Sequence, residues 1–358
     1  MKARPERLSL LQYLLLTAAL LAAMCLCVCL GSVNIPLRET LAVLGTALRR
    51  GAAPEGVSVP IILRVRVPRV LCVALSGAGL SLAGACMQGL LRNPLADGST
   101  LGVSSGAALG AVIAIAFGLN FPSLPFAGTT VMAVLFAFGS LALILALAYR
   151  LDYSLSTNTI ILIGVIYSMF VSSAMSVLVT FASDKLKSIT FWTMGSFQGS
   201  TYGNAALLAA ALAVCGTILC LHARELNAFA IGEDNARNIG VNVRRAKLTV
   251  LIAVSVLIGV CVSVGGTIGF VGLVTPHMVR MLSGPNHKRL LPASMLSGAT
   301  FLLLADLAAR TVLRPRELLA DLAARTVLRP RELPIGVVTS LIGAVVFIFI
   351  FYQTGKER

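Results

Sequence analysis

Ten stretches of about 20 apolar residues recur along this chain, and they limit what it can fold into. Each stretch is long enough to cross the hydrocarbon core of a bilayer as a helix. The 358-residue chain is 57% hydrophobic and only 12% charged, whereas soluble domains average about 25% charged residues. The sequence therefore predicts an all-α polytopic membrane protein with about ten transmembrane helices in one domain, residues 1–358. The predicted spans are residues 8–30, 69–91, 101–119, 126–148, 158–182, 204–221, 246–264, 268–283, 293–310 and 334–352.

The net charge of +15 is carried by the segments between these spans. In that position it favours contact with anionic lipid headgroups or with acidic patches on partner proteins, and we expect no nucleic acid. Ten spans place both termini on one side of the membrane. Lysine and arginine are almost equally frequent on the two sides, so the positive-inside rule does not orient the chain.

The sequence predicts neither a metal site nor a bound cofactor. All eight cysteines lie in apolar runs, where thiols behave as small hydrophobic groups, and the three histidines lack ligand spacing. The chain also lacks the G-x-x-x-x-G-K-[ST] phosphate loop. If ATP and Mg²⁺ drive this protein, they must act on a separate polypeptide.

A polar island at residues 223–247 interrupts two long apolar runs. Leu226, Phe229, Ile231 and Ile239 recur in it at roughly helical spacing. The pattern predicts short amphipathic helices, broken at Gly232 and Gly240, that lie beside the membrane and receive a partner. The alternative is a solvated basic loop that only anchors two spans.

The longest loop, residues 31–69, ends in three clustered arginines, Arg64, Arg66 and Arg69. We expect these side chains at the membrane edge. They either extend to lipid headgroups or bind carboxylates of a partner.

Small residues recur every four positions in three predicted spans. Glycines 98, 102, 106 and 110 predict close packing of a neighbouring helix. A second stripe allows two interpretations, packing with hydroxyls bonded to their own helix, or the wall of a pathway where two copies of the protein meet. Its residues are Gly164, Ser168, Ser172, Ser176 and Thr180, and Gly336, Ser340 and Ala344 form a similar stripe in the last span.

Two further features carry weaker functional hypotheses. Residues 102–106 match the G-x-S-x-G pattern of serine hydrolases, but no strand precedes Ser104, and no acid–histidine pair is evident. Residues 265–280 form a short span interrupted by glycines and Pro276, as in transporters that bend helices around a path. His277 in this span is ionisable, although structural capping is the simpler interpretation.

Five ordered motifs resemble the FecCD family of ABC-importer permeases, which includes vitamin B12, haem and iron–siderophore transporters. The resemblance spans nearly the whole chain. Asn93-Pro94 in the first motif is expected to end a helix. The motifs are RNPLADGSTLGVSSGAALGA (92–111), FWTMGS (191–196), AIGEDNARNIGVNV (230–243), GTIGFVGLVTPHMVR (266–280) and ELPIGVVTSLIGA (332–344).

The resemblance implies a type II importer permease that forms a homodimer in the bacterial cytoplasmic membrane, with both termini in the cytoplasm. Two ATPase subunits would bind from the cytoplasm, and an extracytoplasmic substrate-binding protein would dock outside. It also implies the following roles. A loop at about 222–247 would couple the permease to the ATPase, through Gly232, Glu233, Ala236, Arg237 and Gly240. The binding protein would dock on Arg66, Arg69 and Arg310. Spans five and ten would form the pathway, with Ser168, Ser172, Ser176, Thr180, Gly336 and Ser340.

One feature departs from the family. Residues 304–318, LADLAARTVLRPREL, are repeated letter for letter at 319–333, where the family has one copy. An identical repeat indicates a recent duplication or an error in the assembled sequence. The docking position is therefore Arg310 or Arg325. We expect one copy to bulge on the outer face, with Pro315 and Pro330 ending any continuous helix.

These patterns predict a permease that moves a metal chelate by alternating access and does no covalent chemistry itself. Iron(III)–siderophore is the first candidate substrate, and haem and cobalamin are alternatives. Two other classes are an ion-coupled secondary transporter and an intramembrane serine hydrolase. The first would use Asp306 or Asp321, and the second Ser104 with His277.

Overall fold

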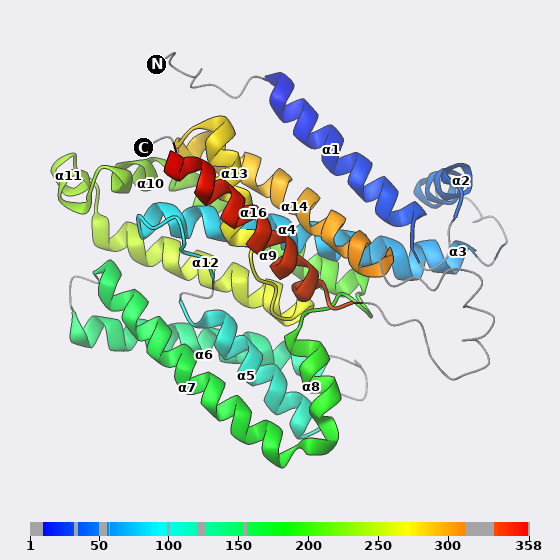
Figure 1. The fold of residues 1–358 in the computed structure, drawn as a ribbon, viewed down its shortest axis with the longest axis horizontal. Coiled ribbons are helices and arrows are strands. Elements are labelled where there is room, and N and C mark those ends of the chain that lie inside the picture. The colour runs from blue at the N-terminus through cyan, green and yellow to red at the C-terminus, as the bar shows by residue number, and fades with distance from the viewer. Residues whose placement is uncertain are drawn as a thin grey trace.

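The computed structural model describes residues 10–31, 35–49, 56, 58–98, 101–119, 127–152, 156–311 and 333–356. Over these residues the chain is helical and contains no strand, which confirms the all-α prediction. The helices form one bundle, in which α12 lies between the helices around α4 and the group of α5, α6 and α7 (Figure 1).

Each of the ten predicted spans coincides with a helix. Among the described residues, seven helices are long and apolar enough to cross a membrane, judged by length and composition. Helix α5 and the stretch Ile335–Phe349 of α16 are apolar but shorter, and α13 has 13 residues. The helices are α1 (Leu10–Cys29), α4 (Val67–Leu90), α5 (Val103–Ala116), α6 (Ala127–Leu151), α7 (Thr157–Phe181), α9 (Tyr202–Leu221), α12 (Val243–Gly265), α13 (Val271–Ser283), α14 (His287–Thr311) and α16 (Ile335–Lys356).

The segment expected to be the longest loop, residues 31–69, is largely helical where it is described. It forms α2 (Leu37–Leu48), α3 (Ser58–Pro60) and a π-helical stretch, η1 (Ile61–Arg66), which continues directly into α4. The loop prediction failed because Pro60 and Pro68 do not break this helix. Pro68 lies in the first turn of α4, where its missing N–H costs little, and the π-helical turns before it adjust the backbone.

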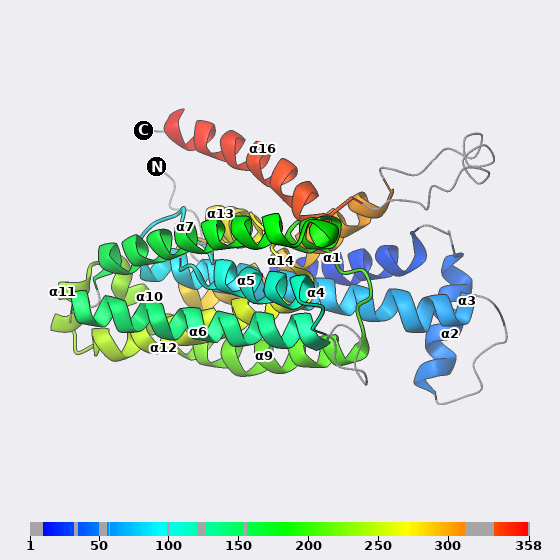
Figure 2. The same ribbon diagram turned by 90° about the horizontal axis from the view of Figure 1, so that it is seen from below.

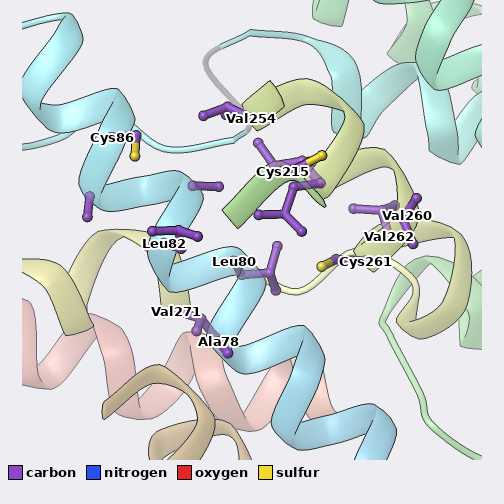
Figure 3. Packing of buried hydrophobic residues seen from close by; sticks show 14 of the residues in the cluster. Ala78, Leu80, Leu82, Cys86, Cys215, Val254, Val260, Cys261, Val262 and Val271 are labelled. Atoms are coloured by element: carbon purple, nitrogen blue, oxygen red, sulfur yellow. The ribbon is translucent and has the colours of Figure 1, made fainter. Parts of the chain in front are cut away.

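The centre of the bundle is α4, whose residues are almost all buried against α9, α12, α13 and α14. Its side chains Leu80, Leu82 and Cys86 lie in one apolar cluster with residues of α9 and α12 (Figure 3). Small residues make this packing possible. A Cβ atom on Gly84 would lie 1.8 Å from the carbonyl oxygen of Gly272, so α4 and α13 touch backbone to backbone.

A second group of helices, α5, α6 and α7, packs on the other side of α12 (Figure 1). The glycine stripe of α5 faces this group, as predicted. A Cβ on Gly106 would meet Ser140 of α6, and one on Gly110 would lie 2.3 Å from the carbonyl oxygen of Met132. Helix α12 therefore joins two closely packed groups, one around α4 and one around α5.

Candidate functional site

The polar island between α9 and α12 folds into two short helices, α10 (Ala223–Ala230) and α11 (Glu233–Asn238). The predicted breaks are confirmed. Gly232 has φ 112° and ψ 150°, and Gly240 has φ 88°, conformations that side chains with a Cβ rarely adopt. We call residues 222–242 the interhelix loop.

Helix α10 is fastened to the group around α4. Leu226 and Phe229 are fully buried in the main apolar cluster. The Asn227 side chain donates to Asn286 Oδ1 over 3.0 Å, and its own oxygen accepts from the backbone N–H of His287 over 2.8 Å. These contacts join α10 to the start of α14.

Helix α11 is bonded to α12 and α7 instead. Glu233 Oε1 lies 2.6 Å from Nζ of Lys247 in α12, and it accepts a 3.4 Å hydrogen bond from the hydroxyl of Thr157, the first residue of α7. The Lys247 side chain is only 1% exposed, and Ala236 of α11 is also buried. The motif pointed to Glu233 as a site residue, but nothing in the local sequence indicated its two partners.

The outward surface of the interhelix loop is apolar at two points. Ile231 is 58% exposed and Ile239 is 65% exposed, so they do not share the buried face of Leu226 and Phe229 as the spacing suggested. They stand at either end of α11. Between them, Arg237 and Asp234 form an exposed ion pair 3.4 Å apart within α11.

Two of the three arginines expected at the membrane edge, Arg66 and Arg69, are buried within the chain. Arg66 Nη1 donates to the carbonyl oxygens of Val28 over 2.5 Å and Cys29 over 2.8 Å. Arg69 is buried beside Asp306, and among the three clustered arginines only Arg64 is exposed. Sequence spacing does not show that the end of α1 and a carboxylate of α14 face Arg66 and Arg69, so it did not indicate their burial.

Asp306 lies between two guanidinium groups. Its Oδ1 atom is 2.9 Å from Nη2 of Arg69, and its Oδ2 atom is 3.0 Å from Nε of Arg310. Arg310 also donates to the carbonyl oxygen of Cys27 at the end of α1. The carbonyl groups at a helix C-terminus carry partial negative charge, so they offset part of the positive excess of this arginine cluster. We call Arg66, Arg69, Asp306 and Arg310 the arginine cluster.

The interhelix loop and the arginine cluster lie at opposite ends of α14. His287 at its start contacts α10, whereas Asp306 and Arg310 near its end contact α4 and α1. A helix of 25 residues is about 37 Å long, slightly more than the bilayer core of about 30 Å. The start of α1 belongs to the interhelix-loop end, because the Tyr13 hydroxyl donates to the carbonyl oxygen of Arg289.

A cavity of about 740 Å³ opens beside α16. Gly336 and Ser340 of the predicted pathway line it, together with Ser104 at the start of α5. The loop at residues 266–270 and the starts of α13 and α16 form much of the remaining wall. Asp97 also lines the cavity and was missed by the sequence reasoning, although the RNPLAD motif contains it.

Two hydroxyls of the α7 stripe donate hydrogen bonds to backbone carbonyl oxygens of α7 itself. Ser176 donates to the carbonyl oxygen of Ser172 over 3.0 Å, and Thr180 donates to that of Ser176 over 2.9 Å. Ser168 differs, since it accepts a 3.2 Å hydrogen bond from Ser105 of α5. Ser172, Ser176 and Thr180 are exposed, so the stripe is left open for contact.

Helices α7 and α16 lie on the same side of the bundle (Figure 2), and both expose large apolar side chains. Met169 and Phe170 of α7 and Leu341 and Val345 of α16 are each about two-thirds exposed. Figure 2 shows α16 standing away from the other helices. We call this side the α7/α16 face.

The serine-hydrolase hypothesis is not supported. Gly102 has φ 72° and is followed directly by α5, so Ser104 lies on the first turn of a helix that no described strand precedes. The Ser104 hydroxyl donates to the carbonyl oxygen of Gly98, and the His277 ring lies 6.2 Å from that of Phe347. A nucleophile elbow requires a strand before the serine and a histidine within hydrogen-bond distance.

The first copy of the 15-residue repeat supplies the end of α14, including Asp306 and Arg310. The backbone N–H of Leu333, at the end of the second copy, donates to the carbonyl oxygen of Ala309. Residues 312–332, with Asp321, Arg325, Pro315, Pro330 and the expected bulge, lie outside the described residues.

Comparisons with known proteins agree with the motifs. The family model of the FecCD transport family matches residues 19–319 and 317–353, two segments that meet inside the repeat. The ABC transporter permease protein YvrB of Bacillus subtilis is 44% identical over 82% of this chain and 79% of its own length. The hemin transport system permease protein HmuU of Yersinia pestis is 38% identical, over 83% and 85%. A solved inward-facing metal-chelate type ABC transporter has 32% identity and a TM-score of 0.80, covering 95% of this chain and 98% of its own.

Proposed function

The chain belongs to the FecCD transport family, and from that premise we propose that it is the permease through which an ATP-driven importer moves a metal chelate, most specifically an iron(III)–siderophore. It is a multi-pass permease subunit of an ABC importer and not an enzyme. The observation that carries the choice of a metal chelate is the likeness, over almost the full length of both chains, to the metal-chelate type transporter.

The energy is supplied at the interhelix loop in this proposal. Two ATPase subunits bind α10 and α11 from the cytoplasm, using the exposed Ile231 and Ile239. The coupling residues Gly232, Glu233, Ala236, Arg237 and Gly240 then transmit closure of the ATPase dimer to the bundle. A rigid tilt of packed helices is one of the established forms of such a transition.

The substrate path lies at the α7/α16 face, where a second copy of the chain completes it. Apolar side chains on this face are exposed in the single chain, and the 740 Å³ cavity beside α16 opens next to them. The exposed hydroxyls Ser172, Ser176 and Thr180, with Gly336 and Ser340 of α16, supply a weakly polar wall for a bulky chelate. The permease in this proposal is a homodimer. Both termini lie in the cytoplasm, on the side where the ATPase binds; the position of the start of α1 at the interhelix-loop end supports this.

The substrate-binding protein docks at the opposite end, near the arginine cluster. Acidic side chains of its lobes would compete with Asp306 for Arg69 and Arg310, and with the end of α1 for Arg66. Arg325 is the alternative to Arg310 as the third docking arginine, beside Arg66 and Arg69. This docking is supported by the position of the cluster across α14 from the interhelix loop.

Transport in reconstituted vesicles tests the proposal. The chain is purified with its ATPase and its binding protein, and uptake of ferrichrome, haemin and cyanocobalamin is measured with ATP or with a proton or sodium gradient. We expect ATP-dependent uptake, greatest for ferrichrome. Uptake by the permease alone, driven by an ion gradient, would refute ATP coupling, and preference for haemin or cyanocobalamin would replace the siderophore as substrate.

A further inference from the structure

A carboxylate, an ammonium group and a hydroxyl bring three helices together at the interhelix loop. Glu233 opens α11, Lys247 lies in the second turn of α12, and Thr157 opens α7. Resting on the proposed function, we propose that Lys247 is a positioning residue that holds Glu233 against the start of α7. A displacement of α11 is then passed to α7 as well as to α12.

The burial of Lys247 makes this contact specific. An ammonium group that is withdrawn from water is stable only beside an opposite charge with good geometry. Glu233 provides that charge at 2.6 Å, although its own side chain is 29% exposed. The position of Glu233 is therefore set by a buried cation of α12, and the same carboxylate oxygen accepts from Thr157.

The interhelix loop is bonded to different helices before and after Gly232. Before Gly232, α10 is held to α14 through Asn227, and after it, α11 is held to α12 and α7. The φ and ψ angles of Gly232 belong to a region open essentially to glycine alone. Rotation about this residue would move α11 relative to α10. Because α14 packs with α4 whereas α7 packs with α5 and α6, such a rotation displaces the two helix groups relative to one another.

This route reaches the proposed pathway directly. Helix α7 carries the exposed apolar side chains and hydroxyls of the α7/α16 face. The exposed pair Asp234–Arg237 lies within α11 alone and offers no comparable link. Asp234 therefore provides a matched control, because it is the neighbouring carboxylate on the same helix but does not contact α12 and α7.

The test compares four variants in the complete complex of permease, ATPase and binding protein, reconstituted in vesicles. They are Lys247→Met, Lys247→Arg, Thr157→Val and the control Asp234→Asn. Three quantities are measured: ATPase bound per permease, ATP hydrolysed, and uptake of whichever of ferrichrome, haemin or cyanocobalamin the unaltered complex imports. Uptake per ATP hydrolysed is the readout that a purely structural role would leave unchanged in correctly assembled complexes.

For Lys247→Met we expect normal ATPase binding and a roughly tenfold fall in uptake per ATP, the effect of losing one hydrogen bond to a charged group. Thr157→Val, which removes only a hydroxyl, should lower the same ratio by about threefold while hydrolysis continues. Lys247→Arg should restore most of the ratio, and Asp234→Asn should leave it unchanged.

Equal uptake per ATP in Lys247→Met, Thr157→Val and Asp234→Asn would overturn the proposed relay, that is, the transmission of an α11 displacement to α7 through Lys247 and Glu233. It would leave the proposed function intact. Loss of ATPase binding in Lys247→Met would also overturn the relay, by assigning Lys247 to docking. If Lys247→Met does not assemble, Thr157→Val decides: an unchanged ratio refutes the relay. Failure of the unaltered complex to import any probe with ATP is a separate result, which refutes the proposed function and the relay with it.

Discussion

The guanidinium group of Arg69 lies 2.9 Å from the carboxylate of Asp306, although 237 positions separate the two residues along the chain. Both side chains are buried, and Arg310 approaches the same carboxylate from the following turn of α14. The contact joins α4, at the centre of the bundle, to α14. Asp306 and Arg310 are four residues apart on α14, a spacing at which an exposed pair contributes only a few tenths of a kcal/mol, but here they belong to a buried ionic network.

Removing the shared carboxylate should destabilise the protein strongly. Asp306→Ala leaves two buried guanidinium groups without their counterion, and breaking a buried pair in this way typically costs about 3–5 kcal/mol. Thermal unfolding in detergent measures the loss. Asp234→Ala is the control, because Asp234 is exposed on α11 and its loss should cost less than about 0.5 kcal/mol. Similar unfolding temperatures for the two variants would contradict a structural role for Asp306.

The contact between α4 and α13 should not tolerate a methyl group. In Gly84→Ala the new Cβ would meet the carbonyl oxygen of Gly272 at 1.8 Å, so the two helices must separate, at a cost of about 1–3 kcal/mol or more. Gly139→Ala in α6 is matched, since nothing lies within 4 Å of its Cβ position. It should be neutral or slightly stabilising. Unfolding temperature measures both variants, and a neutral Gly84→Ala would show that this packing is looser than described.

The two copies of the repeat should contribute unequally. Arg310→Ala removes a partner of Asp306 and should lower the unfolding temperature and the uptake rate, whereas the equivalent change in the second copy, Arg325→Ala, should alter neither. Deletion of residues 319–333 should give a protein that transports at least as well as the full chain, because Leu318 then precedes Pro334 as Leu333 does now. Failure of the deletion variant to fold or assemble would make the second copy structural.

Polar substitutions on the α7/α16 face should weaken the dimer. Met169→Gln and Val345→Gln place an amide where two apolar surfaces are proposed to meet, and we expect monomers in native mass spectrometry of the detergent-solubilised chain. Leu11→Gln in α1 is the control, because Leu11 is similarly exposed on a different helix. An unchanged dimer in both α7/α16 variants would place the second copy elsewhere.

The sequence identified many residues of the interhelix loop, but it did not indicate which way their side chains face. The motif at 230–243 correctly gave the breaks at Gly232 and Gly240, because glycine marks backbone conformations that other residues avoid. It gave no indication that Ile231 and Ile239 would face outward while Leu226 and Phe229 face the core. Two short helices separated by a glycine turn do not share one helical period, so spacing across the turn says nothing about a common face.

The sequence alone determined the all-α membrane fold, the positions of the ten spans and the close packing of glycine-rich helices, since hydrophobic length and side-chain size are local properties. Only the tertiary structure decided which charges are buried and with what partners. Arg69 meets Asp306, and Lys247 meets Glu233 beside Thr157, through helices far apart along the chain. Such pairings depend on which helices become neighbours, and the free energy of a charge depends on that environment far more than on its sequence position.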